Sequence, residues 1–330
     1  MTSTPPPEPT ATAPTPPGAT PARGGARPGT GALLPNDLDP TVFDEGFLRQ
    51  LQRLGLLMKQ PARGGLKGGR RSTKHGQSVE FSDYRDYTLG DDLRQLDWNV
   101  YARLERLFVK LFVEEEDVTV TFLVDASASM AYGRPEKLLF AKRAAAALGY
   151  IALAGEDRVV VAALGGRVAR RHAALRGSGR VFRLLSLLSG IQPVDGPTDL
   201  LAAVRHAGAM LSGRGVVVLI SDLLDPAADR AVRELAAQGS DLTVLHVLSP
   251  EELDPPLNGD LRLVDAETGE GVDVTVDLAT IDAYKARLTA WQDGLAGVAA
   301  KRRAGYAPVS SDLPLADLVF AELRRRRLVG

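Results

Sequence analysis

Three short groups of oxygen-bearing side chains follow or lie between apolar stretches of this sequence. The first reads DASAS directly after TVTFLV, the second reads DGPTD, and the third is the pair SD directly after GVVVLI. Residues two apart can point the same way where a loop leaves a strand, so the alternating Asp and Ser side chains of the first group can face one point. The residues that carry these oxygens are Asp125, Ser127, Ser129, Asp195, Thr198, Asp199, Ser221 and Asp222.

The chemistry of these groups follows from their residue types. Carboxylates and hydroxyls without His or Cys form a hard, all-oxygen ligand set, which suits Mg²⁺ or Mn²⁺ and suits zinc or copper poorly. Mg²⁺ prefers octahedral geometry and normally keeps waters or an outside ligand. An incomplete set of protein ligands therefore leaves a position that a carboxylate of a partner protein can complete.

The surrounding sequence predicts the elements that must bring these groups together. Runs such as VVVLI and TVLHVL are continuously apolar, as in central parallel strands that are covered on both faces. Strands separated by helices of this length imply βαβ crossovers and a three-layer α/β fold with an open, mostly parallel sheet. Ligands of such sheets gather at the carboxyl ends of the strands, and the three groups fall at such ends or in the loop beside them. We expect strands over 118–124, 157–164, 168–172, 215–220 and 242–248, and helices over 136–154, 179–188, 199–211 and 226–238.

The rest of the chain divides at changes in composition. Residues 1–40 contain 11 of the 21 prolines and few large apolar side chains, which predicts a disordered tail. Residues 41–117 hold a helix, a basic Gly-rich loop, and a block of charged and aromatic residues that we expect to pack on the core. We assign residues 118–250 to the α/β domain and residues 251–330 to a small C-terminal part that completes it. That part contains a hairpin over 261–264 and 272–276 and helices over 278–301 and 315–327.

Composition narrows the class of protein. Lys and Arg (40) nearly balance Asp and Glu (41), so no net charge favours nucleic acid or an anionic membrane. The basic stretch Arg53–Lys74 has no interleaved aromatic residues to stack on bases, and we interpret it as a solvated loop. The longest apolar stretch, 144–154, is far shorter than the about 20 residues of a membrane span, and the N-terminus lacks the pattern of a secretory signal. We therefore predict a cytoplasmic protein that has no membrane span and binds no nucleic acid.

The order of the oxygen groups resembles the metal-ion-dependent adhesion site of von Willebrand factor A domains. That site has D-x-S-x-S in one loop, a Thr in a second loop and an Asp in a third, which DASAS, Thr198 and Asp222 match. The resemblance implies a Rossmann-like, von Willebrand factor A-type sheet and a Mg²⁺ or Mn²⁺ site. The sequence departs from the family pattern at Leu223, where the family usually has Gly or another small residue. The ligands that the resemblance implies are Asp125, Ser127, Ser129, Thr198 and Asp222.

A second resemblance begins upstream of that domain. The segment FSDYRDYTLGDDLRQLDWNVYARLERLFVKLFVEEED is similar to the block that precedes the A domain in bacterial proteins of the domain of unknown function 58 family. The similarity covers about residues 69–248 and recurs in GPTDL and LISDLLD. Such proteins are typically encoded beside MoxR-type AAA+ ATPases, so the resemblance implies an ATPase of that type as a partner.

Each signal also has a purely structural interpretation. Asp125 and Thr198 can cap the elements that follow them, with Thr198 as the N-cap of its helix. The charges of the block can form ion pairs that dock the block on the domain and cover Trp98 and Tyr101. We favour this structural interpretation. The alternative is that these charges bind a partner. The residues of that candidate partner surface are Arg85, Asp91, Asp92, Arg94 and Asp97.

Two functions from different classes fit these residues. The leading hypothesis is a non-enzymatic, Mg²⁺-dependent protein-interaction module that binds an acidic residue of a partner. It would work with a MoxR-type ATPase in assembling or maturing another complex. The alternative is a Mg²⁺-dependent phosphatase or phosphotransferase with Asp125 as nucleophile. Such hydrolases usually have a second Asp two residues later as general acid, and Ser127 at that position cannot act as an acid near neutral pH.

Overall fold

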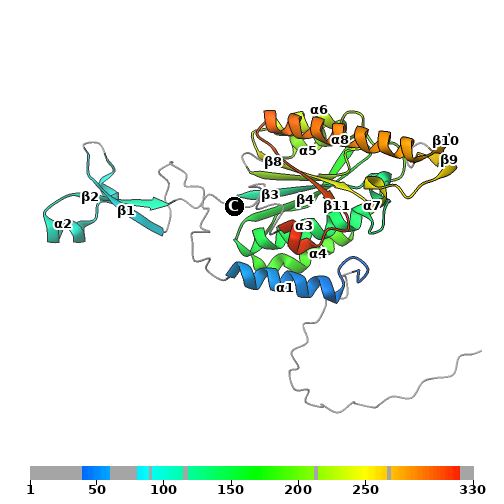
Figure 1. Ribbon diagram of the computed structural model, residues 1–330. Helices are drawn as coiled ribbons and strands as arrows, with labels where there is room; N and C mark the ends of the chain where they lie inside the picture. Colours follow the sequence, from blue (N-terminus) through cyan, green and yellow to red (C-terminus); the bar gives the residue numbers. More distant parts are fainter. Residues whose placement is uncertain are drawn as a thin grey trace, which may run out of the picture. The chain divides into compact units, whose positions relative to one another are not determined.

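The computed structural model describes residues 39–59, 80–88, 91–113, 118–211, 215–265 and 269–319. The predicted tail up to residue 38, most of the basic stretch and the predicted helix beyond residue 319 lie outside this part. Within it, a seven-stranded sheet has the strand order β11-β8-β7-β3-β4-β5, and β6 also pairs with β4 (Figure 1). The strands are β3 (Thr119–Asp125), β4 (Arg158–Gly165), β5 (Val168–Arg171), β6 (Leu175–Arg176), β7 (Val216–Ser221), β8 (Asp241–Leu248) and β11 (Gly305–Ser310).

Parallel pairing places the carboxyl ends of five strands on the same edge of the sheet. β3 pairs in parallel with β4 and β7, β7 with β8, and β8 with β11, whereas the short strands β5 and β6 run antiparallel to β4. The open, mostly parallel sheet that the sequence predicted is confirmed. The chain passes from β3 to β4 on one side and later enters β7 on the other. The ends of β3 and β7 therefore form the switch point at which ligands of such sheets bind.

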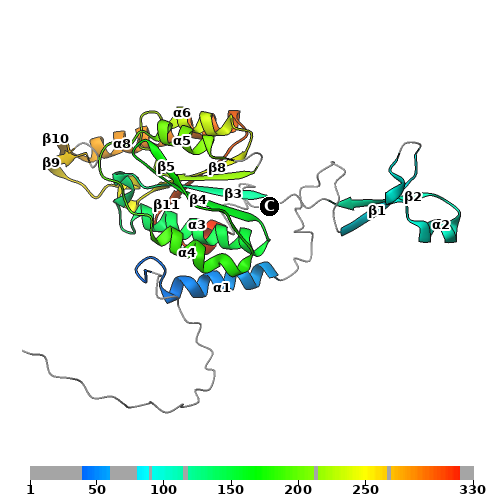
Figure 2. The same ribbon diagram turned by 180° about the vertical axis from the view of Figure 1, so that it is seen from behind.

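Helices cover both faces of this sheet. One core includes residues of α1 (Glu45–Lys59), α3 (Lys137–Ala154) and α4 (Val181–Ser189) (Figure 1). The core on the other face includes residues of α5 (Leu200–Ala209), α6 (Ala228–Ala236) and α8 (Leu278–Lys301) (Figure 2). Neighbouring residues of β3 alternate between the two, with Phe122 in the first core and Leu123 in the second. The continuously apolar strands thus bury both faces, as expected for parallel strands.

The sequence analysis did not predict β11. This strand lies at the edge of the sheet beside β8 and contains Pro308, which is opposite His246. A Pro argues against an inner strand, because it removes a ladder hydrogen bond, but an edge strand tolerates it. The C-terminal part therefore supplies a strand of the main sheet in addition to the predicted hairpin and helices.

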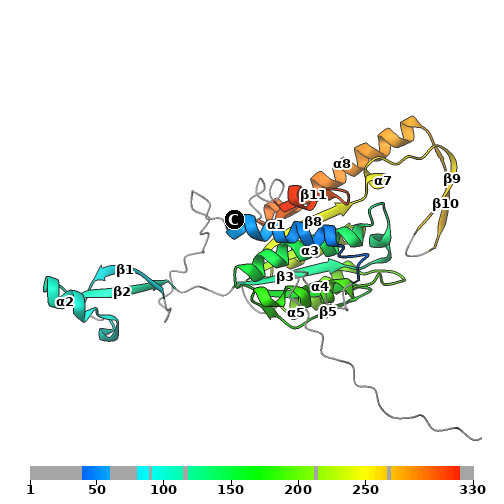
Figure 3. The ribbon, with the colours of Figure 1, turned by 90° about the horizontal axis from the view of Figure 1, so that it is seen from below.

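The predicted C-terminal hairpin is present. β9 (Gly259–Val264) and β10 (Gly271–Val276) pair antiparallel after the short helix α7 (Pro250–Leu253), and α8 follows them (Figure 3). α9 (Leu315–Asp317) is the beginning of the last predicted helix. Among the described helices, none is long and apolar enough to cross a membrane.

The charged and aromatic block forms a separate, two-stranded sheet. β1 (Glu80–Asp86) pairs antiparallel with β2 (Phe108–Val113). The 3₁₀ turn η1 (Leu93–Gln95) and the helix α2 (Trp98–Leu104) lie between the two strands in the sequence. The sequence analysis recognised this block by its composition but assigned no elements to it.

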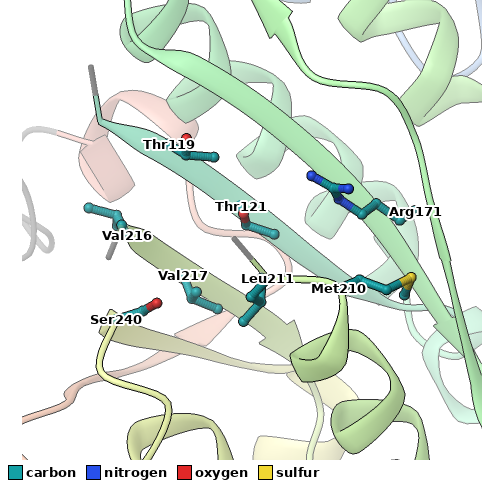
Figure 4. Close-up of a pocket in the computed structure, with 9 residues that line it drawn as sticks. Thr119, Thr121, Arg171, Met210, Leu211, Val216, Val217 and Ser240 are labelled. Atoms are coloured by element: carbon teal, nitrogen blue, oxygen red, sulfur yellow. The ribbon is translucent and has the colours of Figure 1, made fainter. Parts of the chain in front are cut away.

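A small cavity lies at the amino-terminal edge of the main sheet. Thr119, Thr121 and Arg171 are among the residues that line it, and the Arg171 guanidinium extends over the sheet toward the two threonines (Figure 4). Thr119 and Asp125 are the first and last residues of β3. The cavity and the predicted oxygen groups are therefore at opposite ends of that strand.

Candidate functional site

The first loop brings its three oxygen donors together. Asp125 is the buried last residue of β3, and its Oδ1 accepts a hydrogen bond from the Ser127 N–H at 2.9 Å. The 3₁₀ turn η2 (Ala128–Ala131) follows at once, and the hydroxyl oxygens of Ser127 and Ser129 lie 3.0 Å apart. A carboxylate that accepts the N–H two residues on turns the chain locally, which is why Asp is suited to the end of this strand.

The third loop adds a second carboxylate at the end of the neighbouring strand. Ser221, the last residue of β7, donates from Oγ to Asp125 Oδ2 at 2.5 Å and accepts the Leu223 N–H at 2.9 Å. Asp222 follows and is buried. Leu223 has φ 55°, in the left-handed region that favours Gly. This backbone conformation explains why related domains usually have Gly or another small residue at this position.

The second loop runs beside the first, between α4 and α5. The Val194 N–H donates to the Ala126 carbonyl at 2.7 Å, and Thr198 is half-buried with its hydroxyl oxygen buried. The N-cap of α5 is Asp199, whose carboxylate accepts the Ala202 N–H at 2.8 Å. The alternative in which Thr198 caps this helix is therefore wrong, because the next residue performs that role.

The structure adds Lys137, which the sequence analysis missed. Lys137 is the first residue of α3, and its side chain is 0% exposed. Its Nζ lies 2.7 Å from Asp222 Oδ2 and 2.5 Å from Glu252 Oε1. Because a Lys at a helix terminus is normally solvated, the sequence carried no signal that this ammonium points into the site.

Glu252 belongs to α7, the short helix that follows the carboxyl end of β8 at the same edge. Ser249 and Glu252 form a capping box at the start of α7, with the Ser249 N–H donating to Glu252 Oε2 at 2.7 Å. Gly133 of the first loop has φ 99°, and a side chain at this position would collide with Ser249. The capping box is visible in the sequence as SPEE, but nothing in it indicates that the Glu also binds Lys137.

The electrostatics of this edge favour a cation. Burial of the Asp125 carboxyl, together with the neighbouring charge of Asp222, raises the pKa of Asp125 to about 6. The hydrogen bonds from Ser221 and from the Ser127 N–H act in the opposite direction. Two buried carboxylates that repel each other are stabilised by a positive charge between or beside them.

The donor set fits a hard divalent cation. It consists of carboxylate and hydroxyl oxygens, which Mg²⁺ and Mn²⁺ prefer. Across the described part of the chain, no three His, Cys, Asp or Glu side chains gather closely enough to hold a metal. A metal at this edge would therefore depend on the hydroxyls of Ser127 and Ser129 as well as on carboxylates.

One buried histidine lies in the sheet near this edge. His246 is wholly buried near the end of β8, with Nδ1 2.6 Å from the Tyr306 hydroxyl and its ring edge-on to Trp291 at 4.8 Å. Burial lowers the pKa of His246 to about 4, so the imidazole is neutral at pH 7. Its ring packs between β8, β11 and α8.

Most charges of the N-terminal block are engaged within it. Arg85 pairs with Asp91 at 2.8 Å, and hydrogen bonds from Arg85 and from the Thr88 N–H lower the pKa of Asp91 to about 2. Asp92 accepts the Arg94 N–H at the start of η1, and Asp97 caps α2 and accepts the Tyr84 hydroxyl. A partner role for these residues remains a prediction.

The aromatic residues of the block behave differently from its charges. We expected Trp98 and Tyr101 to be covered, but Trp98 is 62% exposed and Tyr101 is also exposed. Their rings pack edge to face at 6.2 Å.

Comparison with known proteins gives one family and several relatives. The model of the family described as "Protein of unknown function DUF58" matches residues 83–293 of this chain. Uncharacterized protein Rv1480 of Mycobacterium tuberculosis is 30% identical over 305 residues, which cover 90% of this chain and 94% of that protein. These matches span the N-terminal block and most of the α/β domain.

Similar solved structures have low sequence identity. An aerotolerance-related membrane protein from Bacteroides fragilis is 19% identical with a TM-score of 0.40, covering 63% of this chain and 99% of that chain. The SpRpn10 VWA domain is 10% identical with a TM-score of 0.36, covering 62% of this chain and 94% of that chain.

Proposed function

Since this chain belongs to the Protein of unknown function DUF58 family, we propose that it is a non-enzymatic protein-interaction module that binds its partner through Mg²⁺ at the carboxyl edge of the sheet. One observation carries this proposal. The hydroxyls of Ser127 and Ser129 lie beside Asp125, whose carboxylate accepts a hydrogen bond from Ser221, the last residue of β7 and the neighbour of Asp222. The position of these oxygens at the switch point of an open parallel sheet, where ligands of such sheets bind, supports their assignment to a ligand site.

The ion would be held by oxygens from three loops, directly or through water. When bound, Mg²⁺ or Mn²⁺ supplies a positive coordination position that accepts a carboxylate of the partner. The residues that would hold it are Asp125, Ser127, Ser129, Thr198 and Asp222.

The surroundings of this site support a protein as the ligand. Each of the three loops exposes one apolar side chain beside its oxygens: Tyr132, Val194 and Leu224 are 52, 40 and 51% exposed. We call these three residues the apolar collar. Their backbone N–H groups donate to the Ser129 carbonyl, the Ala126 carbonyl and the Asp222 carboxylate, respectively. A polar centre surrounded by exposed apolar side chains is typical of a protein-binding surface.

The partner that we propose is a MoxR-type AAA+ ATPase, with which the protein would assemble or mature another complex. This identification follows from the resemblance of the N-terminal block and of the loops GPTDL and LISDLLD to bacterial proteins encoded beside such ATPases. The exposed aromatic residues of the block offer a second contact surface for the same partner.

The phosphatase alternative has less support. Both carboxylate oxygens of Asp125 accept hydrogen bonds, one from the Ser127 N–H and one from the Ser221 hydroxyl. Each of these oxygens keeps a lone pair for a metal or a substrate, so the hydrogen bonds do not separate the two functions. The phosphatase has less support because Ser127 stands where such hydrolases have a second Asp as general acid.

The test measures metal binding and partner capture with the same variants. Isothermal titration with Mg²⁺ and Mn²⁺ is expected to show one site in the wild type and none in Asp125→Asn. Asp293→Asn, which changes an exposed carboxylate of α8, should leave the affinity unchanged. Affinity capture is expected to recover an AAA+ ATPase in Mg²⁺ but not in EDTA, and not with Asp125→Asn.

Two results would contradict the proposal. Equal metal affinity of wild type and Asp125→Asn would remove the site assignment. Hydrolysis of p-nitrophenyl phosphate that depends on both Mg²⁺ and Asp125 would favour the phosphatase.

A further inference from the structure

Lys137 is a buried positive charge at the edge where the metal is proposed to bind. Its side chain is fully buried, and its two partners are Asp222, also buried, and Glu252, which is 15% exposed. Lys is almost never fully buried unless its charge is paired, because removing an ammonium from water is costly. The carboxylate of Asp222 therefore takes part in a buried ion pair, although the proposed metal would use the same carboxylate.

We propose that Lys137 is a built-in counter-ion that keeps the affinity of this site for divalent cations low, so that the metal is exchangeable. This inference rests on the proposed function and concerns the regulation of the same site. Asp222 is shared: its Oδ2 binds the ammonium at 2.7 Å, and its charge is one of those that would attract the metal.

The electrostatic argument gives the sign of the effect. A fixed positive charge beside a metal site repels a divalent ion and neutralises part of the negative charge that attracts it, and such effects are strong where water is excluded. The carboxylates of Asp125, Asp222 and Glu252 are offset by one ammonium. Removing that ammonium leaves the site more negative, and removing Glu252 leaves it more positive.

A purely structural role for Lys137 predicts something different. Lys137 joins α3 to α7, and α7 is itself held by α8 through the Tyr284 hydroxyl, which donates to the Glu252 carbonyl at 2.8 Å. If the Lys137 side chain only connected these elements, its loss would loosen the site and weaken metal binding. The two interpretations therefore differ in the direction of the change in affinity.

The experiment compares Mg²⁺ and Mn²⁺ affinities of the full-length wild type, Lys137→Met and Glu252→Gln by isothermal titration. Lys137→Met keeps most of the length of the unbranched side chain and removes its charge. We expect it to bind Mg²⁺ about tenfold more tightly or more, as the loss of one nearby positive charge requires. Glu252→Gln should bind Mg²⁺ severalfold more weakly. Lys285→Met, which removes a surface lysine paired with Asp254 near α7, should not change the affinity.

Thermal unfolding with and without Mg²⁺ provides an independent readout. Lys137→Met is expected to melt at a lower temperature than the wild type in EDTA, because its carboxylates are left unpaired, and to recover most of this difference in Mg²⁺. If Lys137→Met does not fold without metal, Lys137→Gln, which removes the charge but keeps an N–H donor for Asp222, tests the same increase in affinity.

The outcomes separate this inference from the function it rests on. A wild type that binds no Mg²⁺ overturns both. A wild type that binds Mg²⁺, with Lys137→Met no tighter or Glu252→Gln no weaker, overturns the counter-ion role alone and leaves Lys137 as a structural connector.

Discussion

At the scale of single residues, the site depends on how Asp125 is held. Ser221 ends the neighbouring strand and is wholly buried, and its hydroxyl joins the carboxylate of Asp125 to the backbone of the third loop. A buried carboxylate without hydrogen-bond donors is costly, so this serine fixes both the orientation of Asp125 and the path of the chain into Asp222.

We expect Ser221→Ala to lower the free energy of unfolding by roughly 1–3 kcal/mol, because it leaves an oxygen of Asp125 and the Leu223 N–H without their partner. Urea denaturation at pH 7 measures this change. Ser186→Ala, a change of the same kind in α4, is the control and should have a much smaller effect. An equal effect of the two substitutions would show that the hydroxyl of Ser221 has no special role.

At the scale of elements, the loops after β3, α4 and β7 each combine oxygen donors with one exposed apolar residue. This arrangement follows from the parallel sheet, which directs the ends of its strands, and the loops that follow them, to one edge. The caps of the following helices keep the loops in place. The N-cap of α5 is Asp199, and the third loop reaches the same helix through Asp225, which accepts the Leu200 N–H at 2.8 Å.

The apolar collar predicts a change in partner binding that is independent of the metal. We expect about tenfold weaker partner binding from each of three variants, Tyr132→Ser, Val194→Ser and Leu224→Ser, with unchanged Mg²⁺ affinity. A tenfold change corresponds to about 1.4 kcal/mol of lost apolar burial. Binding is measured with the captured ATPase by biolayer interferometry. Leu278→Ser, at an exposed leucine of α8, is the matched control. Unchanged partner affinity in all three variants would exclude the collar from the interface.

At the scale of the whole molecule, the C-terminal part completes the main sheet. β11 covers the edge of β8, and its residue Ala307 is wholly buried in the core that α3 also lines. A strand added by the last part of the chain makes stability of the α/β domain depend on residues outside the 118–250 segment that the sequence assigned to it.

Ala307→Asp tests that dependence. An unpaired carboxylate buried in this core should destabilise the protein by roughly 3 kcal/mol or more. This is enough to lower the temperature at which the entire α/β domain unfolds cooperatively. Ala316→Asp, at an exposed position of α9, should be nearly neutral. Circular dichroism melts compare the two variants, and a small effect of Ala307→Asp would mean that β11 is dispensable.

The sequence by itself determined most elements of the α/β domain and the two strands that are followed directly by oxygen donors. Continuous apolar runs indicated strands buried on both faces, and the Asp and Ser residues that follow two of these runs lie at one edge of the sheet, as expected from parallel pairing. Local rules of this kind also predicted the hairpin of β9 and β10 and the start of α8. They failed for β11, because a Pro is compatible only with an edge position, and edge position is a property of the assembled sheet.

Only the tertiary structure decided which charges meet. Lys137 lies 85 residues from Asp222 and 115 from Glu252 in the sequence, yet its ammonium contacts both carboxylates. Strand order and the packing of the loops at the edge of the sheet bring these three residues together, and neither can be derived from hydrophobic periodicity, which reports the buried face of each element and not its neighbours. The oxygen donors were therefore predictable from the sequence, whereas the cation that balances them was not.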